Sequence, residues 1–457
     1  MRQKSKEPTL SHTSFNHSLF KDKKCLIIGA GKSGIWCAKL LKKKLTKFIT
    51  LSDKKEIKTN FSFINEKDID KNLIKTIDFA VKSPGIEPEN PVIKLLKKFS
   101  KPIFSEVEVA LSFSKTKNII MITGTNGKST TSYLTHLIIN EHFKKNNKKS
   151  ILCGNIGNPI SKEILKAKKD DFLVIEISSY QLEDSNYIKP KIGVILNITP
   201  DHIEHHKSME NYIKAKFKIF SFMDENSTLI INFDDPVLAR IKEKGFKLLR
   251  FSTKNKNADA FFSKKTKRII TKNNWKLKTA HIPGEHNIYN QMASVLVAMV
   301  CGIDKKTIES VFSSFKGLEH RIEFVREING VKYYNDSKAT NVDSTLVCLR
   351  SLGKKKNIHL ILGGVHKNSP YKPLIPLIKR YVKKIYTVGS SQDIIKKELC
   401  GTAPIIPAGT VKKAVELTSN SAVRGDIVLL SPACASLDQF KNFEERGRKF
   451  KSYVKKL

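Results

Sequence analysis

The sequence predicts an α/β fold of about three domains, and three observations support that prediction. The chain has 457 residues, which is longer than a chain that folds around a single hydrophobic core usually is. Domains of about 150 residues are common, so about three are expected. Strand-length apolar runs alternate with helix-length segments along most of the chain. Glycine-rich turns follow two of those runs, at 29–34 and 124–127, the position at which α/β proteins bind phosphate groups.

Composition and the N-terminal residues argue against membrane and secreted classes. The apolar run that starts at Met292 is far too short to cross a bilayer. Residues 1–20 contain neither an apolar block nor a small-residue cleavage site, unlike a secretory signal. The seven cysteines lack C-x-x-C pairing, which favours reduced thiols and argues against a zinc site. We therefore expect a cytoplasmic protein, with no membrane insertion.

The net charge of +40 would suit a polyanionic partner. However, the lysines are spread over the whole chain, often in doublets, without the interleaved aromatic residues on which bases stack. We therefore expect no nucleic-acid partner and a preference for small anionic substrates. We also expect a monomer.

The first segment, residues 21–112, has a β-α-β pattern. A strand ends in Gly29, Gly31 and Gly34, a G-x-G-x-x-G turn, and a helix is predicted from Ile35 to Lys44. Asp53, at the end of the next strand, occupies the place of a ribose or base partner. The turn alone fits a redox nucleotide, a UDP-sugar or a purely structural role.

The second segment, residues 113–317, contains continuous apolar runs at 118–123, 171–178 and 191–199. Such runs are typical of strands buried on both faces of a parallel sheet. Residues 288–299 are apolar nearly all round, and we predict that they form a buried helix.

The third segment, residues 318–457, opens with a hairpin predicted at Asn329 and Gly330, because both turn positions need positive φ. Three further strands, separated by helix-length stretches, follow it. A basic helix over 439–456 ends the chain, so we predict a doubly wound unit.

The string "TGTNGKST", residues 123–130, matches a phosphate loop only in part, because Ile122 stands where the first glycine of G-x-x-x-x-G-K-[ST] belongs. Gly127 would let backbone amides approach an anion, Lys128 would neutralise outer phosphates and Ser129 would bind Mg²⁺. A fortuitous turn is the alternative.

Two further positions indicate a site at this place, and the first of them suggests a metal. Glu176 lies in an apolar strand, where an unpaired carboxylate would cost several kcal/mol, so it needs a cation or a lysine partner. His202 follows another strand, and we predict that it is a site residue, with His205 and His206 at the surface. Lys216 shares a helix face with Tyr212, a spacing that alone gives it no function.

Together these strings resemble the ATP-dependent Mur ligases of peptidoglycan synthesis, which are related to folylpolyglutamate synthases. The shared strings in the first two thirds are "TGTNGKST", "GNIG" (154–157), "EISSYQLE" (176–183), "NITPDH" (197–202), "GEHN" (284–287) and "HR" (320–321). In the last third, "NDSKATN" (335–341) and "LLSPACASLDQFKNFEERG" (429–447) resemble the branch of the family that adds D-glutamate.

The resemblance implies an N-terminal Rossmann-like UDP-binding domain (21–112), a central P-loop-like ATPase domain with a parallel sheet (113–317) and a C-terminal Rossmann-like amino-acid domain (318–457). Residues 1–20 are an extension outside it. In the implied reaction, ATP phosphorylates the carboxylate of UDP-N-acetylmuramoyl-L-alanine. The amine of D-glutamate then attacks the acyl phosphate, and phosphate leaves.

The resemblance also implies site residues. For ATP they are Gly124, Thr125, Asn126, Gly127, Lys128, Ser129, Thr130, Asn287, Asn290, His320, Arg321, Asp336 and Lys338. For Mg²⁺ they are Ser129, Glu176, His202 and a carbamylated Lys216. For the UDP substrate they are Ser33, Asp53, Lys54 and Asn155, and for D-glutamate Thr340, Lys367, Ser436 and Phe443. Lys128, His202 and Lys216 are the implied catalytic residues.

One departure from the family pattern lies beside the amino-acid site, where Val365 and His366 replace a frequent acidic residue before Lys367. Competing functions are another Mur ligase, an amide ligase like folylpolyglutamate synthase, a nucleotide-sensing or nucleic-acid-binding module, and an oxidoreductase. The second phosphate loop argues against the oxidoreductase.

Overall fold

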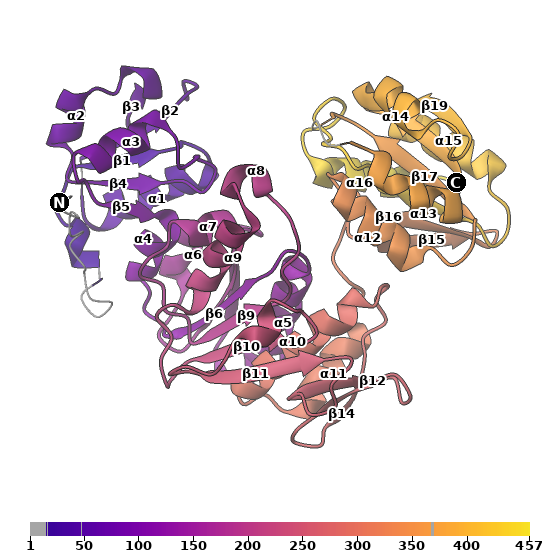
Figure 1. The fold of residues 1–457 in the computed structure, drawn as a ribbon, viewed down its shortest axis with the longest axis horizontal. Coiled ribbons are helices and arrows are strands. Elements are labelled where there is room, and N and C mark those ends of the chain that lie inside the picture. The colour runs from indigo at the N-terminus through magenta and orange to yellow at the C-terminus, as the bar shows by residue number, and fades with distance from the viewer. Residues whose placement is uncertain (1–14, 16, 47, 367–369) are drawn as a thin grey trace. The chain divides into compact units, whose positions relative to one another are not determined.

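The computed structural model describes residue 15 and residues 17–46, 48–366 and 370–457. Three β-sheets follow one another along the chain, coloured indigo to purple, magenta to salmon and orange to yellow (Figure 1). They fall into two compact units. One holds the first two sheets, up to residue 279 and from 288 to 313, and the other holds 280–287 and the third sheet from 314 onward.

The first sheet has five parallel strands in the order β3-β2-β1-β4-β5. Its strands are β1 (Cys25–Ile28), β2 (Ile49–Asp53), β3 (Ser62–Asn65), β4 (Phe79–Lys82) and β5 (Ile103–Ser105), and its helices are α1 (Lys32–Lys44), α2 (Lys71–Thr76), α3 (Pro91–Lys98) and α4 (Glu106–Ser112). Alternate residues of β1 pack against α1 on one face and against α2 and α3 on the other. The predicted β-α-β unit is confirmed.

Helix α1 begins at Lys32, earlier than the predicted Ile35. A Cβ on Gly34 would lie 2.0 Å from the Gly29 carbonyl oxygen, so only glycine lets the first turn of this helix pack over the strand end.

The second sheet has nine strands in the order β14-β13-β12-β11-β10-β9-β6-β8-β7. Its strands are β6 (Asn118–Thr123), β7 (Ser150–Gly154), β8 (Phe172–Glu176), β9 (Ile192–Ile195), β10 (Thr228–Asn232), β11 (Lys247–Ser252), β12 (Ala260–Ser263), β13 (Arg268–Thr271) and β14 (Lys276–Lys278). The parallel sheet predicted here extends from β7 to β12, and β13 and β14 add an antiparallel edge that the sequence reading did not identify.

The helices of this part are α5 (Lys128–Phe143), α6 (Ile160–Glu163), α7 (Ser179–Glu183), α8 (Ile203–His206), α9 (Met209–Phe217), α10 (His286–Val300) and α11 (Lys305–Ser314). Helix α10 confirms the predicted buried helix, since residues 292–298 are all buried. No helix among the described residues is both long and apolar enough to cross a membrane.

The third sheet has the order β15-β16-β20-β17-β18-β19, in which only β15 is antiparallel. Its strands are β15 (Glu323–Ile328), β16 (Val331–Asn335), β17 (Ile358–Gly363), β18 (Val382–Val388), β19 (Ile405–Gly409) and β20 (Ile427–Leu430), and its helices are α12 (Val342–Leu352), α13 (Ile375–Tyr381), α14 (Gln392–Leu399), α15 (Val411–Ser421) and α16 (Phe443–Lys455).

The third sheet is doubly wound, as predicted. Leu360 and Leu362 of β17 pack with α12, α13 and α14, whereas Ile361 packs with α15 and α16 on the opposite face. The hairpin is confirmed, with φ of 50° at Asn329 and 77° at Gly330. Helix α16 begins later than predicted because the Asn442 side chain accepts a hydrogen bond from Glu445 N and so caps the helix there.

The first and second sheets are joined by buried polar contacts. The Ser161 amide donates to Glu106 Oε1 at 2.9 Å, and the Tyr187 amide donates to Glu108 Oε1 at 2.8 Å. The Lys82 ammonium, only 2% exposed, forms an ion pair with Asp184. Helix α4 and the end of β4 are therefore fixed against the second sheet.

Candidate active site

The phosphate loop connects β6 to α5 and has the backbone that an anion site requires. Gly124 and Gly127 have φ of 149° and 87°, values that favour glycine. A Cβ on Gly127 would lie 2.2 Å from Asn290 Oδ1, so this glycine permits a close approach that a side chain would prevent. Helix α5 starts immediately after, at Lys128, and its N-terminal amides and dipole favour a bound anion.

Neighbouring strand ends fix the loop in place. The Thr125 amide donates to the Asn197 carbonyl at 2.9 Å, and the Asn126 amide donates to Asn197 Oδ1 at 2.8 Å. Thr125 Oγ1 lies 2.9 Å from the Tyr212 hydroxyl. No role was predicted for Asn197, although it lies in the quoted string "NITPDH". A polar amide inside the apolar run 191–199 is the signal that could have identified it.

Glu176, at the end of β8, lies beside Ile122 of β6. Its side chain is buried, at 2% exposure; Oε1 accepts from Asn155 Nδ2 at 2.6 Å, and Oε2 has no hydrogen-bond partner. A buried carboxylate oxygen without a partner is costly, and a divalent cation with oxygen ligands would satisfy it. The residues present therefore fit Mg²⁺. Asn155, predicted for the UDP substrate, here orients this carboxylate.

Lys216 is 1% exposed, and its Nζ donates to the Gly124 carbonyl at 3.0 Å. Lys128 Nζ donates to the same carbonyl at 2.8 Å. Burial, and secondly the charge of Lys128, lowers the pKa of Lys216 well below its usual range. Lys216 is therefore a buried amine at the phosphate loop.

His202 has φ of 53° and immediately precedes α8. Partial burial lowers the pKa of His202, the Asp201 carboxylate opposes the shift, and the charges of Lys128 and Lys216 add to it. The carboxyl ends of β6, β8 and β9 thus carry Lys128, Glu176 and His202 at one edge of the sheet. The prediction that His205 and His206 lie at the surface was wrong for His206, which is 2% exposed, and the His205 side chain is only 10% exposed.

The residues predicted for the UDP substrate gather around the start of α1. Asp53 Oδ2 accepts from the Ala30 amide at 2.8 Å, so the carboxylate also stabilises the glycine turn. Ser33 is half-buried in the first turn of α1, and Lys54 is exposed just after β2. Lys32 Nζ donates to the Gly157 carbonyl at 2.9 Å, which joins this turn to the loop that carries Asn155.

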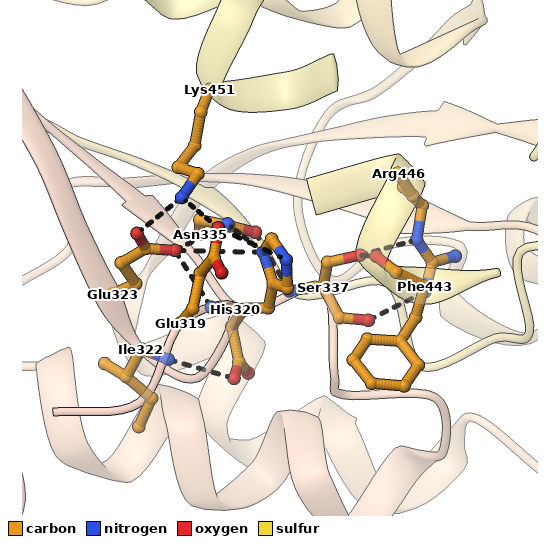
Figure 2. A network of polar contacts seen from close by, with 10 residues as sticks. Glu319, His320, Ile322, Glu323, Asn335, Ser337, Phe443, Arg446 and Lys451 are labelled. Atoms are coloured by element: carbon orange, nitrogen blue, oxygen red, sulfur yellow. Dashed lines mark hydrogen bonds and ion pairs between the residues drawn. The ribbon is translucent and has the colours of Figure 1, made fainter. Parts of the chain in front are cut away.

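In the C-terminal unit, the turn before β15 carries His320 and Arg321. His320 has φ of 65°, is 3% exposed and receives a hydrogen bond from Asn335 Nδ2 at 2.9 Å (Figure 2). Lys451 of α16 donates to Glu319 at 2.6 Å and to Glu323 at 2.8 Å, on both sides of that turn (Figure 2). The network fixes the backbone from which Arg321 extends, and the nucleotide contact of His320 stays a prediction.

Asp336 follows β16 and is buried. Its Oδ1 accepts from the Ile322 amide at 3.1 Å, and its Oδ2 accepts from Ser431 Oγ at 2.8 Å. Burial raises the pKa of Asp336 to about 6, although these hydrogen bonds and Arg321 oppose the shift. Lys338 lies two positions further on and is half-buried. Asn287, also predicted for the nucleotide, donates to the Pro283 carbonyl at 2.5 Å.

Three of the four residues predicted for D-glutamate are described. Ser436 is 3% exposed, Thr340 is half-buried, and the Phe443 carbonyl accepts from Ser337 Oγ at 2.8 Å. Lys367 lies outside the described residues. Val365 pairs with Ala435 through two backbone hydrogen bonds, so the departure from the family pattern still leaves the chain paired beside Ser436.

Arg446 is a buried residue to which the sequence reading gave no role. It is 1% exposed, and it donates to Ser337 Oγ at 3.0 Å and to the Ser337 carbonyl at 2.9 Å (Figure 2). It also donates to the Cys434 carbonyl at 3.1 Å. It therefore connects α16 to the two loops that carry Thr340 and Ser436. An arginine on the apolar side of the helix predicted over 439–456 is the signal that could have identified this buried role.

Two domain models of one protein family match this chain, one after the other along the sequence. Residues 122–298 match the model of the Mur ligase middle domain, and residues 320–434 match that of the Mur ligase, glutamate ligase domain. A UDP-N-acetylmuramoylalanine–D-glutamate ligase of Elusimicrobium minutum is 42% identical over 97% of this chain and 100% of its own. The chain belongs to the Mur ligase family.

A second relative supports this family membership, and a solved structure supports the fold. A UDP-N-acetylmuramoylalanine–D-glutamate ligase of Caldicellulosiruptor bescii is 38% identical over 96% of this chain and 98% of its own. Among solved structures, the MurF ligase of Thermotoga maritima in complex with ADP has a TM-score of 0.60 and 16% identity, and the match covers 97% of each chain. That likeness supports the three-domain α/β fold of a Mur ligase.

Proposed function

We propose that this chain is an ATP-dependent ligase that adds D-glutamate to UDP-N-acetylmuramoyl-L-alanine in peptidoglycan precursor synthesis. The observation that carries the proposal is the buried Glu176 oxygen without a partner, on the strand beside the phosphate loop onto which Lys128 and Lys216 both donate. Relatives named for that reaction support the choice of substrates. We further propose domains that span residues 21–112, 113–317 and 318–457. We also propose that the protein is a monomer located in the cytoplasm.

Each part of the site has a task in this scheme. The amides at the start of α5 and the Lys128 ammonium bind the phosphates of ATP and stabilise the charge that develops during phosphoryl transfer. Ser129, Glu176, His202 and a carbamylated Lys216 would hold Mg²⁺, which neutralises phosphate charge when bound. Ser33, Asp53, Lys54 and Asn155 bind the UDP substrate. Thr340, Lys367, Ser436 and Phe443 orient D-glutamate in the C-terminal unit.

The state of Lys216 supports its proposed modification. Carbamate formation requires an unprotonated amine, and burial, which lowers the pKa of Lys216, favours that form. The reaction joins the amine nitrogen to the carbon of carbon dioxide and releases one proton. It converts a neutral amine into a carbamate, whose carboxylate oxygens suit a metal, whereas the ammonium form of lysine does not.

Phosphate release from ATP tests the function. The purified protein with Mg²⁺, ATP and UDP-N-acetylmuramoyl-L-alanine should release phosphate when D-glutamate is added, and only at background level with L-lysine or diaminopimelate. Equal release with those two amino acids would assign the chain to a sister ligase. ATP turnover without any amino acid would contradict the ligase scheme.

Substitution of Lys216 tests the mechanism. Lys216→Ala should lose nearly all activity, and added short carboxylic acids should restore part of it, because they can replace the carbamate. Lys214→Ala is the matched control, since Lys214 lies on the same helix with a side chain 69% exposed. Full activity of Lys216→Ala would remove the carbamate from the scheme.

A further inference from the structure

Two histidines and a glutamate meet at the ends of α7 and α8. Among the described residues, Glu183, His205 and His206 form a group whose candidate ligand atoms all lie within 4.8 Å of one another. His205 Nε2 lies 2.8 Å from Glu183 Oε2, and His206 Nδ1 lies 3.3 Å from Glu183 Oε1. The second oxygen of one carboxylate thus faces a second imidazole.

His206 indicates what this group lacks. Its side chain is buried, its Nε2 lies 3.0 Å from Ser179 Oγ, and its Nδ1 makes no hydrogen bond. When Nε2–H donates to Ser179, Nδ1 carries a lone pair, and it lies 3.3 Å from a carboxylate oxygen that also carries lone pairs. A cation between the two would convert this repulsion into two bonds.

The surroundings match those of metal-binding histidines. Such histidines usually bind the metal with one nitrogen and donate the other N–H to an oxygen, as His206 can do to Ser179. Two imidazoles and one carboxylate are the three protein ligands of many zinc sites with an open fourth position. The cysteine spacing argued against a zinc site, but the ligands of this group are two imidazoles and a carboxylate, and Glu183 comes from a different helix.

We propose that Glu183, His205 and His206 bind a first-row divalent cation of the zinc class. Imidazole nitrogens favour such ions over Mg²⁺, which prefers oxygen. The site shares no residue with the set proposed for magnesium. Because His202 directly precedes α8, a cation held by His205 and His206 would fix the turn that presents His202. The inference does not depend on the proposed reaction.

Cobalt(II) is a suitable probe, because a tetrahedral site gives it much stronger visible absorption than water does. The full-length protein is titrated with Co²⁺ in excess Mg²⁺, which occupies the oxygen-rich residues around Glu176. We expect one equivalent to produce a visible band that added Zn²⁺ removes. Absence of a band, or one that Zn²⁺ leaves unchanged, would overturn the proposal.

Variants locate the ion. His205→Gln and Glu183→Gln should each weaken Co²⁺ binding by about 100-fold, and Ser179→Ala, which removes only the outer hydrogen bond, by about 10-fold. Glu204→Gln, an exposed neighbour on α8, and His202→Ala should keep the band. A band lost in His202→Ala but kept in His205→Gln would place cobalt on the magnesium residues and overturn the assignment. Circular dichroism checks that each variant is folded.

Discussion

Asp336 is a carboxylate of the candidate site whose burial in its charged form lowers the stability of the folded protein. Burial raises its pKa to about 6, so above that pH the folded protein holds a buried charge that the unfolded chain would expose to water. The stabilising contribution of the protonated carboxyl is complete below the unfolded pKa of about 4. It is lost as the pH rises through the folded value.

Asp336→Asn should therefore stabilise the protein at pH 8 and have little effect near pH 4. We expect a gain in the free energy of unfolding of about 1 to 3 kcal/mol at the higher pH, together with loss of activity. Urea denaturation at the two pH values measures the difference. Asp170→Asn, at an exposed position in the turn before β8, should change stability by less than about 0.5 kcal/mol at both. A gain that does not depend on pH would contradict the explanation.

Single residues were predictable where one segment contains the signal. Glu176 stands alone as a charge in an apolar strand, so its need for a cation follows from the strand itself. His206, like His205, was predicted at the surface. Its burial depends on Glu183 and Ser179 of another helix, which no local pattern reveals.

At the scale of elements, α16 supports the turn that carries His320 and Arg321. A Cβ on Gly447 would lie 2.2 Å from His320 Nδ1, so the helix lies directly against that ring. Lys451, one turn further along, holds the acidic residues on either side of it.

Gly447→Ala is expected to destabilise the protein by about 1 to 3 kcal/mol, because the added methyl group must displace the imidazole. The sign is informative, since glycine to alanine inside an ordinary helix stabilises by about 1 kcal/mol. Thermal unfolding measures the change. Lys449→Ala, at an exposed position of the same helix, should differ from wild type by less than about 0.5 kcal/mol. A more stable Gly447→Ala protein would show that the ring moves freely.

The spacing of apolar residues predicted that the long elements exist and whether each is a helix or a strand. The residues at which they begin depend instead on local contacts. The start of α16 depends on the Asn442 side chain, and the start of α1 depends on packing over Gly29. Strands β13 and β14 were missed because they are only four and three residues long and have polar residues at both ends. The turn between them contains Asn274 at φ of 59° rather than a two-residue Asn-Gly signal.

At the scale of the whole molecule, one compact unit contains two sheets. The sequence motifs describe each sheet separately, because each β-α-β pattern is local. The contacts that join the sheets use residues such as Lys82 and Asp184 that belong to no motif, so the sequence gives no sign of them.

Asp184→Asn should destabilise this unit by about 3 kcal/mol, because Lys82 would remain buried without a carboxylate partner. Differential scanning calorimetry measures the shift. Glu89→Gln breaks the exposed Lys94 pair in the first sheet and should cost less than about 1 kcal/mol. An equal effect of the two substitutions would mean that the buried pair adds nothing to the joint between the sheets.

The buried carboxylates of α4 have a practical consequence for anyone who wishes to produce the ATP-binding part by itself. A fragment that starts at residue 113 would leave behind Glu106 and Glu108, which accept the amide hydrogens of Ser161 and Tyr187. It would also expose an apolar patch where α4 had packed. Recombinant pieces cut at that boundary should aggregate, whereas pieces that keep both sheets together should remain dispersed and crystallise more readily.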